Sequence, residues 1–463
     1  METCRLQDLA IYGHKLCSLV FRLLPQLQGF PPLKKFCRDG PVNLALTETK
    51  TAATLPELPH DILMVIFAAL EIPDLVRAGS VCSSWHSAYA ELRTLGKHKP
   101  GQTPCLAYTS QSDPDDVLSL YSLAEKRSYK LTLPQPPIRS RYLIGSSHGW
   151  LVTVDDRSEM HLLNPITCEQ IALPSVSTIE HVKPKFDEYG QVCKYEMSGH
   201  TGTRSSRDPP SIFALAELRG RLYWKAFVFP DTSTGSYIVV LIHNPQCQLS
   251  FARAGDDKWT WLPPDYLYDD CTYKDGILYA VNVKGEFHAF DLSGPVVTVK
   301  TVIRVPKHYV CDGRYIVQAP WGTEGVLVYR IVGDHDLEPE PGASSYWNTK
   351  EIKIFGIDAL WNEIKVIDCL HDHVLFLGHN LSLCLSADEY PALKANRSYF
   401  TDDNFLWTLG HKNSHRDMGI LKLDDNSREE LVSPQLWSNC PAPVWITPDL
   451  RKINVMGSMS QQL

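Results

Sequence analysis

The sequence predicts a small all-α module of three helices near the N-terminus, followed by an all-β domain that forms a β-propeller of about six to seven blades. Three observations along the 463 residues predict this division. Apolar residues recur at helical spacing over 55–95. Gly, Pro and Lys gather over 96–104, which is typical of a linker. From 105 to 450, short apolar runs of period two alternate with turn residues, which indicates many strands.

The helical module carries more apolar side chains than so short a unit can bury by itself. Its first helix holds a wide apolar stripe made of Ile62, Leu63, Ile66, Phe67 and Leu70. A unit below about 40 residues rarely supports its own core, and each large apolar side chain left in water forfeits roughly 1.5–3 kcal/mol. We therefore expect the module to bury its surplus either as a cap on the rest of the chain or against a partner.

The β-rich half contains a loose internal repeat. Segments 147–165, 218–245 and 274–291 each pair a strand that begins at or near Gly with a second strand that ends in Asn-Pro or Asp. Such units are hairpins, and about 350 residues at roughly 40–50 residues per blade give six or seven blades. An array of β-sandwiches has a similar pattern. Two polar insertions, 187–210 and 334–345, interrupt the repeat, and we expect the first to be a loop.

Composition and charge exclude several classes of function. With 44% hydrophobic and 21% charged residues the chain is globular, and a net charge of −8 argues against general binding to nucleic acid or to membrane surfaces. Its 13 cysteines form no C-x-x-C pair, so no zinc or redox motif is present. Without a secretion signal, these thiols indicate a reducing compartment, the cytoplasm or the nucleus.

No catalytic constellation stands out. His411 and His415 have the spacing of a zinc pair but lack the Glu of H-E-x-x-H. The recurrent Asp doublets fit turns, where Asp bonds its own backbone. P-loop and dinucleotide motifs do not occur. The sequence thus predicts a protein that is not an enzyme and has no catalytic residue, cofactor or metal ion.

Residues 55–92, LPELPHDILMVIFAALEIPDLVRAGSVCSSWHSAYAEL, resemble the F-box family. The matching features are Leu58-Pro59, Asp61-Ile62-Leu63, Ile66, Leu70, Asp74-Leu75, Arg77, Val81-Cys82 and Trp85. This resemblance implies a docking module that binds the Skp-type adaptor subunit of a cullin ubiquitin ligase by helix-in-groove recognition. The residues expected to dock on the adaptor are Leu58, Pro59, Ile62, Leu63, Ile66 and Leu75. Val81 and Trp85 are expected to hold the three helices together.

The β-rich half resembles the KIB-type β-propeller domain, which follows F-boxes in plants. The resemblance is carried by GSSHGWLVTVDD, MHLLNPITCEQIALP, DDKWTWLP, YKDGILYAVNVKGEFHAFDL, NRSYFTDDNF and PAPVWITP. Together with the F-box it implies a substrate-recognition adaptor of a Skp–cullin–F-box ubiquitin ligase. The alternative is a carbohydrate-active or ligand-binding propeller whose helices are only a structural cap. The N-terminal segment 1–54 and the tail 451–463 receive no assignment.

Overall fold

A computed structural model of the chain consists of two compact units, residues 1–99 and residues 100–463. Each unit is described by itself. The structure describes residues 58–99, 101–200, 209–231, 234–262, 267–294, 296–304, 311, 313–319, 325–333, 349–358, 363–403, 416–432, 437–438 and 440–451. Predictions that concern residues 1–54, the insertion 334–345, and His411 and His415 therefore lie outside the described residues.

The first unit contains the three predicted helices, α2 (His60–Ala68), α3 (Ile72–Gly79) and α4 (Ser83–Leu95). Asp61 and Asp74 lie in the first turns of α2 and α3, where a negative charge favours the helix dipole. Gly96 ends α4 in the left-handed conformation with φ of 63°, a conformation that glycine adopts without steric cost. The three-helix module predicted from apolar spacing is thus confirmed.

Helix α4 packs against both other helices of the unit. Its Trp85 ring meets Phe67 of α2 edge-on, with the centroids 5.4 Å apart. Near the end of α3, a Cβ on Gly79 would lie 2.6 Å from Tyr89 Cγ, so only glycine allows this close approach to α4. The buried side chains of the unit come from all three helices: Leu63, Ile66, Phe67, Leu70, Ile72, Leu75, Ala78, Ala88 and Leu92.

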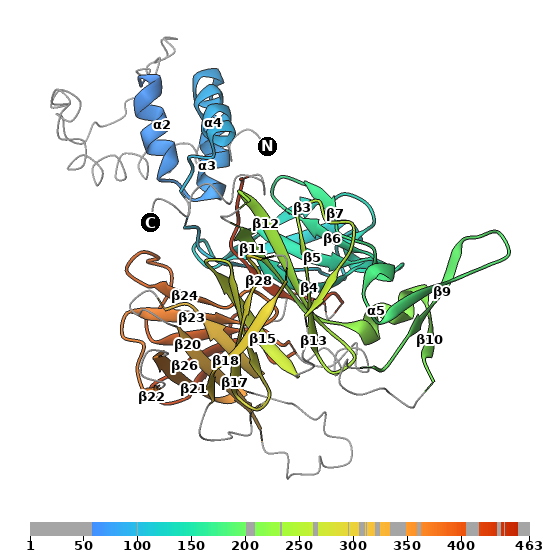
Figure 1. Cartoon of the computed structure of the whole chain (residues 1–463). Coiled ribbons are helices and arrows are strands. Elements are labelled where there is room, and N and C mark those ends of the chain that lie inside the picture. The colour runs from blue at the N-terminus through green and yellow to red at the C-terminus, as the bar shows by residue number, and fades with distance from the viewer. Residues whose placement is uncertain are drawn as a thin grey trace, which may run out of the picture. The chain divides into compact units, whose positions relative to one another are not determined.

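The second unit contains six sheets of four or five strands among its described residues, which we number as blades 1 to 6 (Figure 1). Blades 1 to 3 have the strand orders β28 (Val444–Ile446), β1 (Cys105–Tyr108), β2 (Val117–Ser122), β3 (Arg127–Thr132); β4 (Tyr142–Ser147), β5 (Trp150–Val154), β6 (Met160–Leu163), β7 (Gln170–Ala172); and β11 (Tyr223–Asp231), β12 (Ser236–His243), β13 (Gln248–Arg253), β14 (Thr260–Leu262). Blades 4 to 6 have the orders β15 (Tyr268–Lys274), β16 (Ile277–Asn282), β17 (Glu286–Asp291), β18 (Thr298–Arg304); β19 (Gly313–Val317), β20 (Val326–Val332), β21 (Thr349–Asp358), β22 (Glu363–Ile367); and β24 (Leu383–Ser386), β23 (His373–Leu377), β25 (Arg397–Phe400), β26 (Gly419–Lys422), β27 (Arg428–Glu429).

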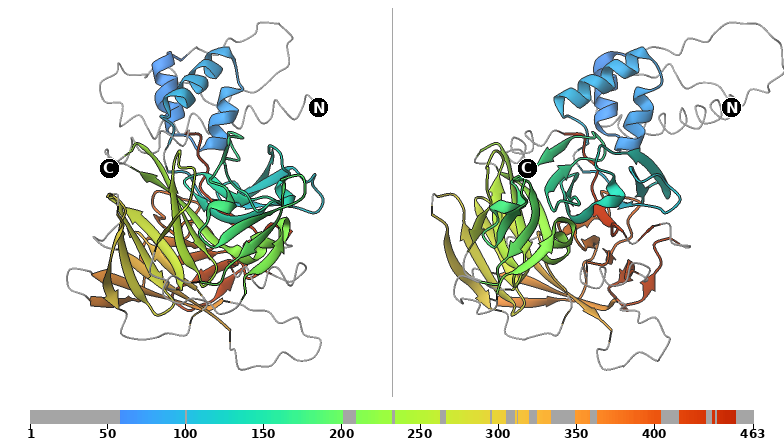
Figure 2. Two further views of the ribbon diagram at one scale, coloured as in Figure 1. Left: turned by 45° about the vertical axis from the view of Figure 1, so that its right-hand side comes forward. Right: turned by 90° about the vertical axis from the view of Figure 1, so that its right-hand side faces the viewer.

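The six blades form a closed ring, which Figure 2 shows from two sides. Six clusters of buried apolar residues each join one blade to the next, and the last joins blade 6 back to blade 1. Closure is completed inside blade 1, where the C-terminal strand β28 pairs antiparallel with β1, Cys105 lying opposite Ile446. The β-propeller predicted from the hairpin repeats is confirmed.

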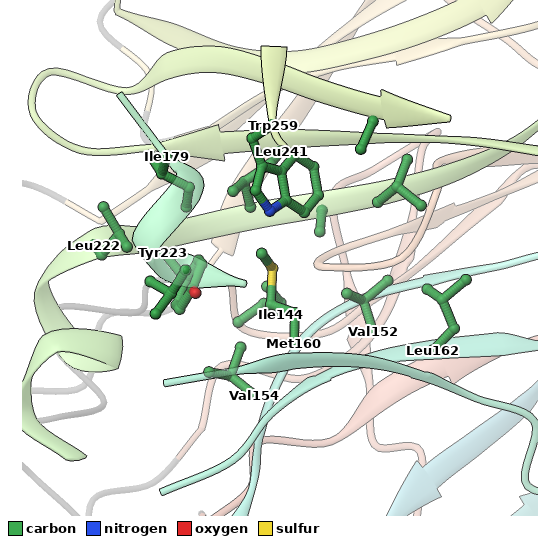
Figure 3. Packing of buried hydrophobic residues seen from close by; sticks show 14 of the residues in the cluster. Ile144, Val152, Val154, Met160, Leu162, Ile179, Leu222, Tyr223, Leu241 and Trp259 are labelled. Carbon is green, nitrogen blue, oxygen red and sulfur yellow. The ribbon is translucent and has the colours of Figure 1, made fainter. Parts of the chain in front are cut away.

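The strands of blade 3 show why the sequence reads as nearly continuous apolar runs. Val239 and Leu241 of β12 pack in the cluster shared with blade 2, whereas Val240 and Ile242 pack in the cluster shared with blade 4. Leu241 is labelled in Figure 3. Successive side chains of a strand point to opposite faces. A blade with a neighbour on each side therefore needs apolar residues on both faces, and the polar-out alternation of a half-exposed sheet is lost.

An additional three-stranded sheet lies between blades 2 and 3 in the chain. Its strand order is β10 (Ser211–Ala214), β9 (Val192–Met197) and β8 (Val182–Phe186), and α5 (Leu215–Leu222) follows it. The prediction of a loop over 187–210 is therefore wrong for β9, whose charged residues hide its strand character. Short 3₁₀ turns at η2 (Ile138–Ser140) and η3 (Val176–Thr178) complete the described elements.

Candidate functional site

The six residues predicted to dock on an adaptor separate into two groups in the structure. Leu63, Ile66 and Leu75 are fully buried within the chain. Leu58 and Ile62 are half-buried, and Pro59 is exposed. The first group is thus part of the apolar core that supports the helices, while the second group lies at the surface of α2 or just before it. The docking role itself stays a prediction for all six residues.

Helix α2 is apolar on two faces. One face holds the buried residues Leu63, Ile66 and Phe67. Along the other run Pro59, Ile62, Val65 and Ala69, which we call the α2 stripe; their spacing of three or four residues places them on one side of a helix. All four are exposed or half-buried, and Val65 is 49% exposed. The surplus of apolar surface inferred from the sequence therefore lies on this stripe.

Two further apolar residues of the module are exposed beyond the α2 stripe. Val76 of α3 is 45% exposed and Val81 is 41% exposed. The prediction that Val81 packs in the core is therefore wrong. Helix α4 begins only at Ser83, and Val81 lies in the turn before it. Trp85 is half-buried and contacts Phe67; its role in holding the three helices together stays a prediction.

Charged side chains around the module form surface pairs. The His60 ring Nε2 and the Glu91 Oε2 of α4 are 2.8 Å apart, and Arg77 donates to Asp74 within α3 at 2.8 Å. Lys99 Nζ lies 2.6 Å from Glu71 Oε1 and ties the end of the module to the start of α3. Pairs this exposed contribute little to stability, about 0–1 kcal/mol each. Apolar surface therefore provides the stronger basis for partner binding.

In the propeller, charged groups are buried where several blades meet. The Lys225 ammonium of β11 lies 2.9 Å from the Asp270 carboxylate of β15, and Asp270 also accepts a hydrogen bond from the Ile316 backbone N–H of β19. Burial raises the pKa of Asp270 despite the nearby ammonium. One ion pair thus links blades 3, 4 and 5.

A second buried group of charges links blades 5 and 6. Arg330 of β20 donates to Asp417 at 2.7 Å and to Asp403 at 3.0 Å, and Tyr315 donates to Asp403 at 2.8 Å. Burial alone would raise the pKa of Asp417, but Arg330 and the surrounding donors outweigh it and hold the pKa below its usual value. Both oxygens of each carboxylate accept hydrogen bonds from the chain, which suits a structural role.

The described residues include no group of three or more His, Cys, Asp or Glu side chains arranged to hold a metal ion. Similarly, no helix in the described part of the chain has the length and hydropathy needed to span a bilayer. The tryptophans Trp150, Trp259 and Trp445 are buried in the interfaces between blades. The described residues thus form a ring of blades with a packed interior and a helical module with exposed apolar side chains.

These features define a protein with a three-helix module ahead of a β-propeller in the chain, and the comparisons agree. The F-box-like family model matches residues 55–92 and the KIB1-4 beta-propeller model matches residues 120–422. The second match spans more than half of the chain, so the chain belongs to the KIB1-4 beta-propeller family, with an F-box-like segment before the propeller.

The chain is similar to F-box proteins of Arabidopsis thaliana, to two of them over most of its length. The chain is 25% identical over 429 residues to the F-box protein SKIP23, covering 88% of this chain and 98% of the relative. It is 22% identical over 408 residues to a putative F-box protein, with 82% and 92% covered. The F-box protein KIB4 is 25% identical over 253 residues, with 53% and 62% covered.

Proposed function

We propose that this protein is a substrate adaptor of a Skp–cullin–F-box ubiquitin ligase and performs no chemistry itself. The F-box-like module binds the Skp-type adaptor subunit, and the propeller holds a target protein. Catalysis by the ligase then rests on proximity, because holding a target near the charged carrier enzyme raises the effective concentration of its lysines. The cytoplasm and the nucleus, where such ligases act, are the expected compartments.

The observation that carries the proposal is the α2 stripe. A helix whose exposed side is apolar is suited to lie in a hydrophobic groove of another protein. Burial of Val65 alone is worth up to roughly 1.5–3 kcal/mol, and a few such anchors supply most of an interface's affinity. Val76 and Ile62 add to the available apolar surface. Leu63, Ile66 and Leu75 contribute indirectly, by supporting the helices from inside.

Co-purification tests the proposal with exposed residues rather than core residues. A chain with Val65→Asp and Val76→Asp should lose a co-expressed Skp-type adaptor and its cullin, because the new carboxylates would be buried in the interface. The matched control is Leu95→Asp, since Leu95 on α4 is 49% exposed, the same as Val65. Retention of the adaptor by the double variant, at the level of the control, would refute the proposal.

A double substitution of Leu63 and Ile66 by Asp would not answer the same question. Both side chains are buried, so two carboxylates there would unfold the helical module whether or not it binds a partner. Loss of adaptor binding in that variant reports on folding alone. Circular dichroism of each variant is therefore part of the experiment, and only variants with the helical signal of the native chain are compared.

A further inference from the structure

The three-stranded sheet of β8, β9 and β10 is a rigid platform on one side and an open surface on the other. On its inner side, Val182 and Tyr195 are buried in the cluster shared by blades 2 and 3, and the Tyr195 hydroxyl donates to the Arg157 carbonyl at 3.3 Å. The rings of His181 and His200, which flank the sheet, stack 4.4 Å apart beside Trp261 of blade 3. The sheet is thus attached firmly to the ring. Figure 1 shows β9 and β10 lying apart from the blades.

The outer side of this sheet is basic. Strand register places Lys183, Glu196 and Ile212 in one row, and Lys185, Lys194 and Ala214 in the next. The three lysines are exposed, and Ile212 is 60% exposed. Lys185 pairs with Glu196 at 2.5 Å, so the outer side has an excess of positive charge on a chain whose net charge is −8. This charge favours an acidic partner.

One edge of the sheet is open to a further strand. The Ala214 N–H donates to the Glu217 side chain rather than to β9, so it points away from the sheet. In an antiparallel pair the backbone groups of alternate residues point the same way, and the N–H and C=O of Ile212 therefore face the outer edge of β10. No described strand pairs there.

The opposite edge, along β8, is blocked. Val182 N–H already bonds the Ile179 carbonyl, and Pro184 has no N–H to offer. Proline at such a position is a common way to protect an edge strand against pairing. Each edge thus has one outward N–H that is already bonded, Val182 on β8 and Ala214 on β10. The next outward residue is Pro184 on β8, which has no N–H, but Ile212 on β10, which has both an N–H and a C=O to pair with another strand.

We propose that β10 binds an extended acidic segment of the target protein as a fourth strand. This inference rests on the proposed function and identifies where the target is held. An apolar residue of the segment packs beside Ile212. Two residues further along, a backbone C=O of the segment replaces the Glu217 carboxylate as acceptor of the Ala214 N–H, and a Glu or Asp beside the small Ala214 reaches across it to Lys194. The segment recognised thus has an apolar residue and an acidic residue two positions apart on one face.

The experiment uses the full chain and a synthetic fluorescent peptide with alternating valine and glutamate on one face. Binding followed by fluorescence anisotropy should weaken about tenfold for Lys194→Glu, since an attractive cross-strand charge pair becomes repulsive. Lys274→Glu is the matched control, because Lys274 is an exposed strand lysine of blade 4. A peptide with lysine in place of glutamate should prefer the Lys194→Glu chain. Equal binding of both peptides by both chains would overturn the inference.

Two further readouts separate strand addition from simple charge attraction and from failure of the proposed function. Bound peptide should slow hydrogen exchange at the Ile212 amide, and Ile212→Pro should abolish binding; unchanged exchange at Ile212 overturns the inference. Both variants should still bind the Skp-type adaptor. Absence of peptide binding with adaptor binding intact overturns the inference alone, whereas loss of adaptor binding by the native chain overturns the proposed function.

Discussion

Lys225 and Asp270 form a fully buried ion pair that joins two neighbouring blades of the ring. Their side chains are 3% and 0% exposed, and the Nζ and Oδ1 atoms lie 2.9 Å apart. Because Asp270 also binds the Ile316 N–H of the next blade, the pair connects three of the six blades. Such a pair adds little to stability by itself. Replacing one partner by a neutral residue, however, leaves the other charge buried and unpaired.

We therefore expect Lys225→Met to destabilise the propeller by roughly 3–5 kcal/mol in urea unfolding. Asp270→Asn in the same chain should recover more than half of that loss, because the amide oxygen still accepts from Ile316 and neither residue of the former pair then carries a charge. A Lys225→Met chain as stable as the native protein would show that the pair carries no such constraint.

The buried imidazole of His243 predicts a pH dependence of stability. Burial lowers its pKa to about 4, and the ring bonds the Asn244 carbonyl and the Ser250 hydroxyl. In the unfolded chain the pKa is about 6.5. The unfolded state thus binds the proton first as the pH falls, so the stabilising contribution is complete above pH 6.5 and is lost between 6.5 and 4.

His243→Gln should remove this contribution, worth up to roughly 3 kcal/mol at pH 4 relative to pH 7. The measurement is the unfolding free energy of both chains across that range. Comparing the two chains is necessary because Asp269 has the opposite effect: burial raises its pKa to about 6, which favours the folded state as the pH falls. Parallel pH profiles for the two chains would contradict the assignment.

Substitution of Trp445 in β28 should destabilise the propeller, because this residue packs where the ring closes. Its side chain is buried and meets Phe376 of blade 6 edge-on with centroids 5.2 Å apart. Trp445→Ala should cost about 3–5 kcal/mol of stability, measured as a shift in the urea midpoint. Trp445→Phe should cost much less, because the indole N–H has no hydrogen-bond partner among the residues that the structure describes. Val366→Ala, at a side chain 62% exposed, is the neutral control.

Periodicity alone predicted the two parts of the chain, because three short helices and a ring of hairpins each impose their own spacing of apolar residues. It could not tell which side of α2 is exposed, since Ile62 and Val65 are as apolar as Leu63 and Ile66. It also missed β9 and the Lys225–Asp270 pair. Charged residues in a strand resemble surface positions until the register and the neighbouring blade are known.

The most direct measurement is a calorimetric titration of purified Skp-type adaptor into the full chain, comparing the native protein with Val65→Asp and Leu95→Asp. The account predicts a one-to-one complex with the native chain and with Leu95→Asp, and an affinity at least tenfold weaker for Val65→Asp because the α2 stripe is where the adaptor binds. Equal affinities for all three chains, or no binding by the native chain, would contradict it.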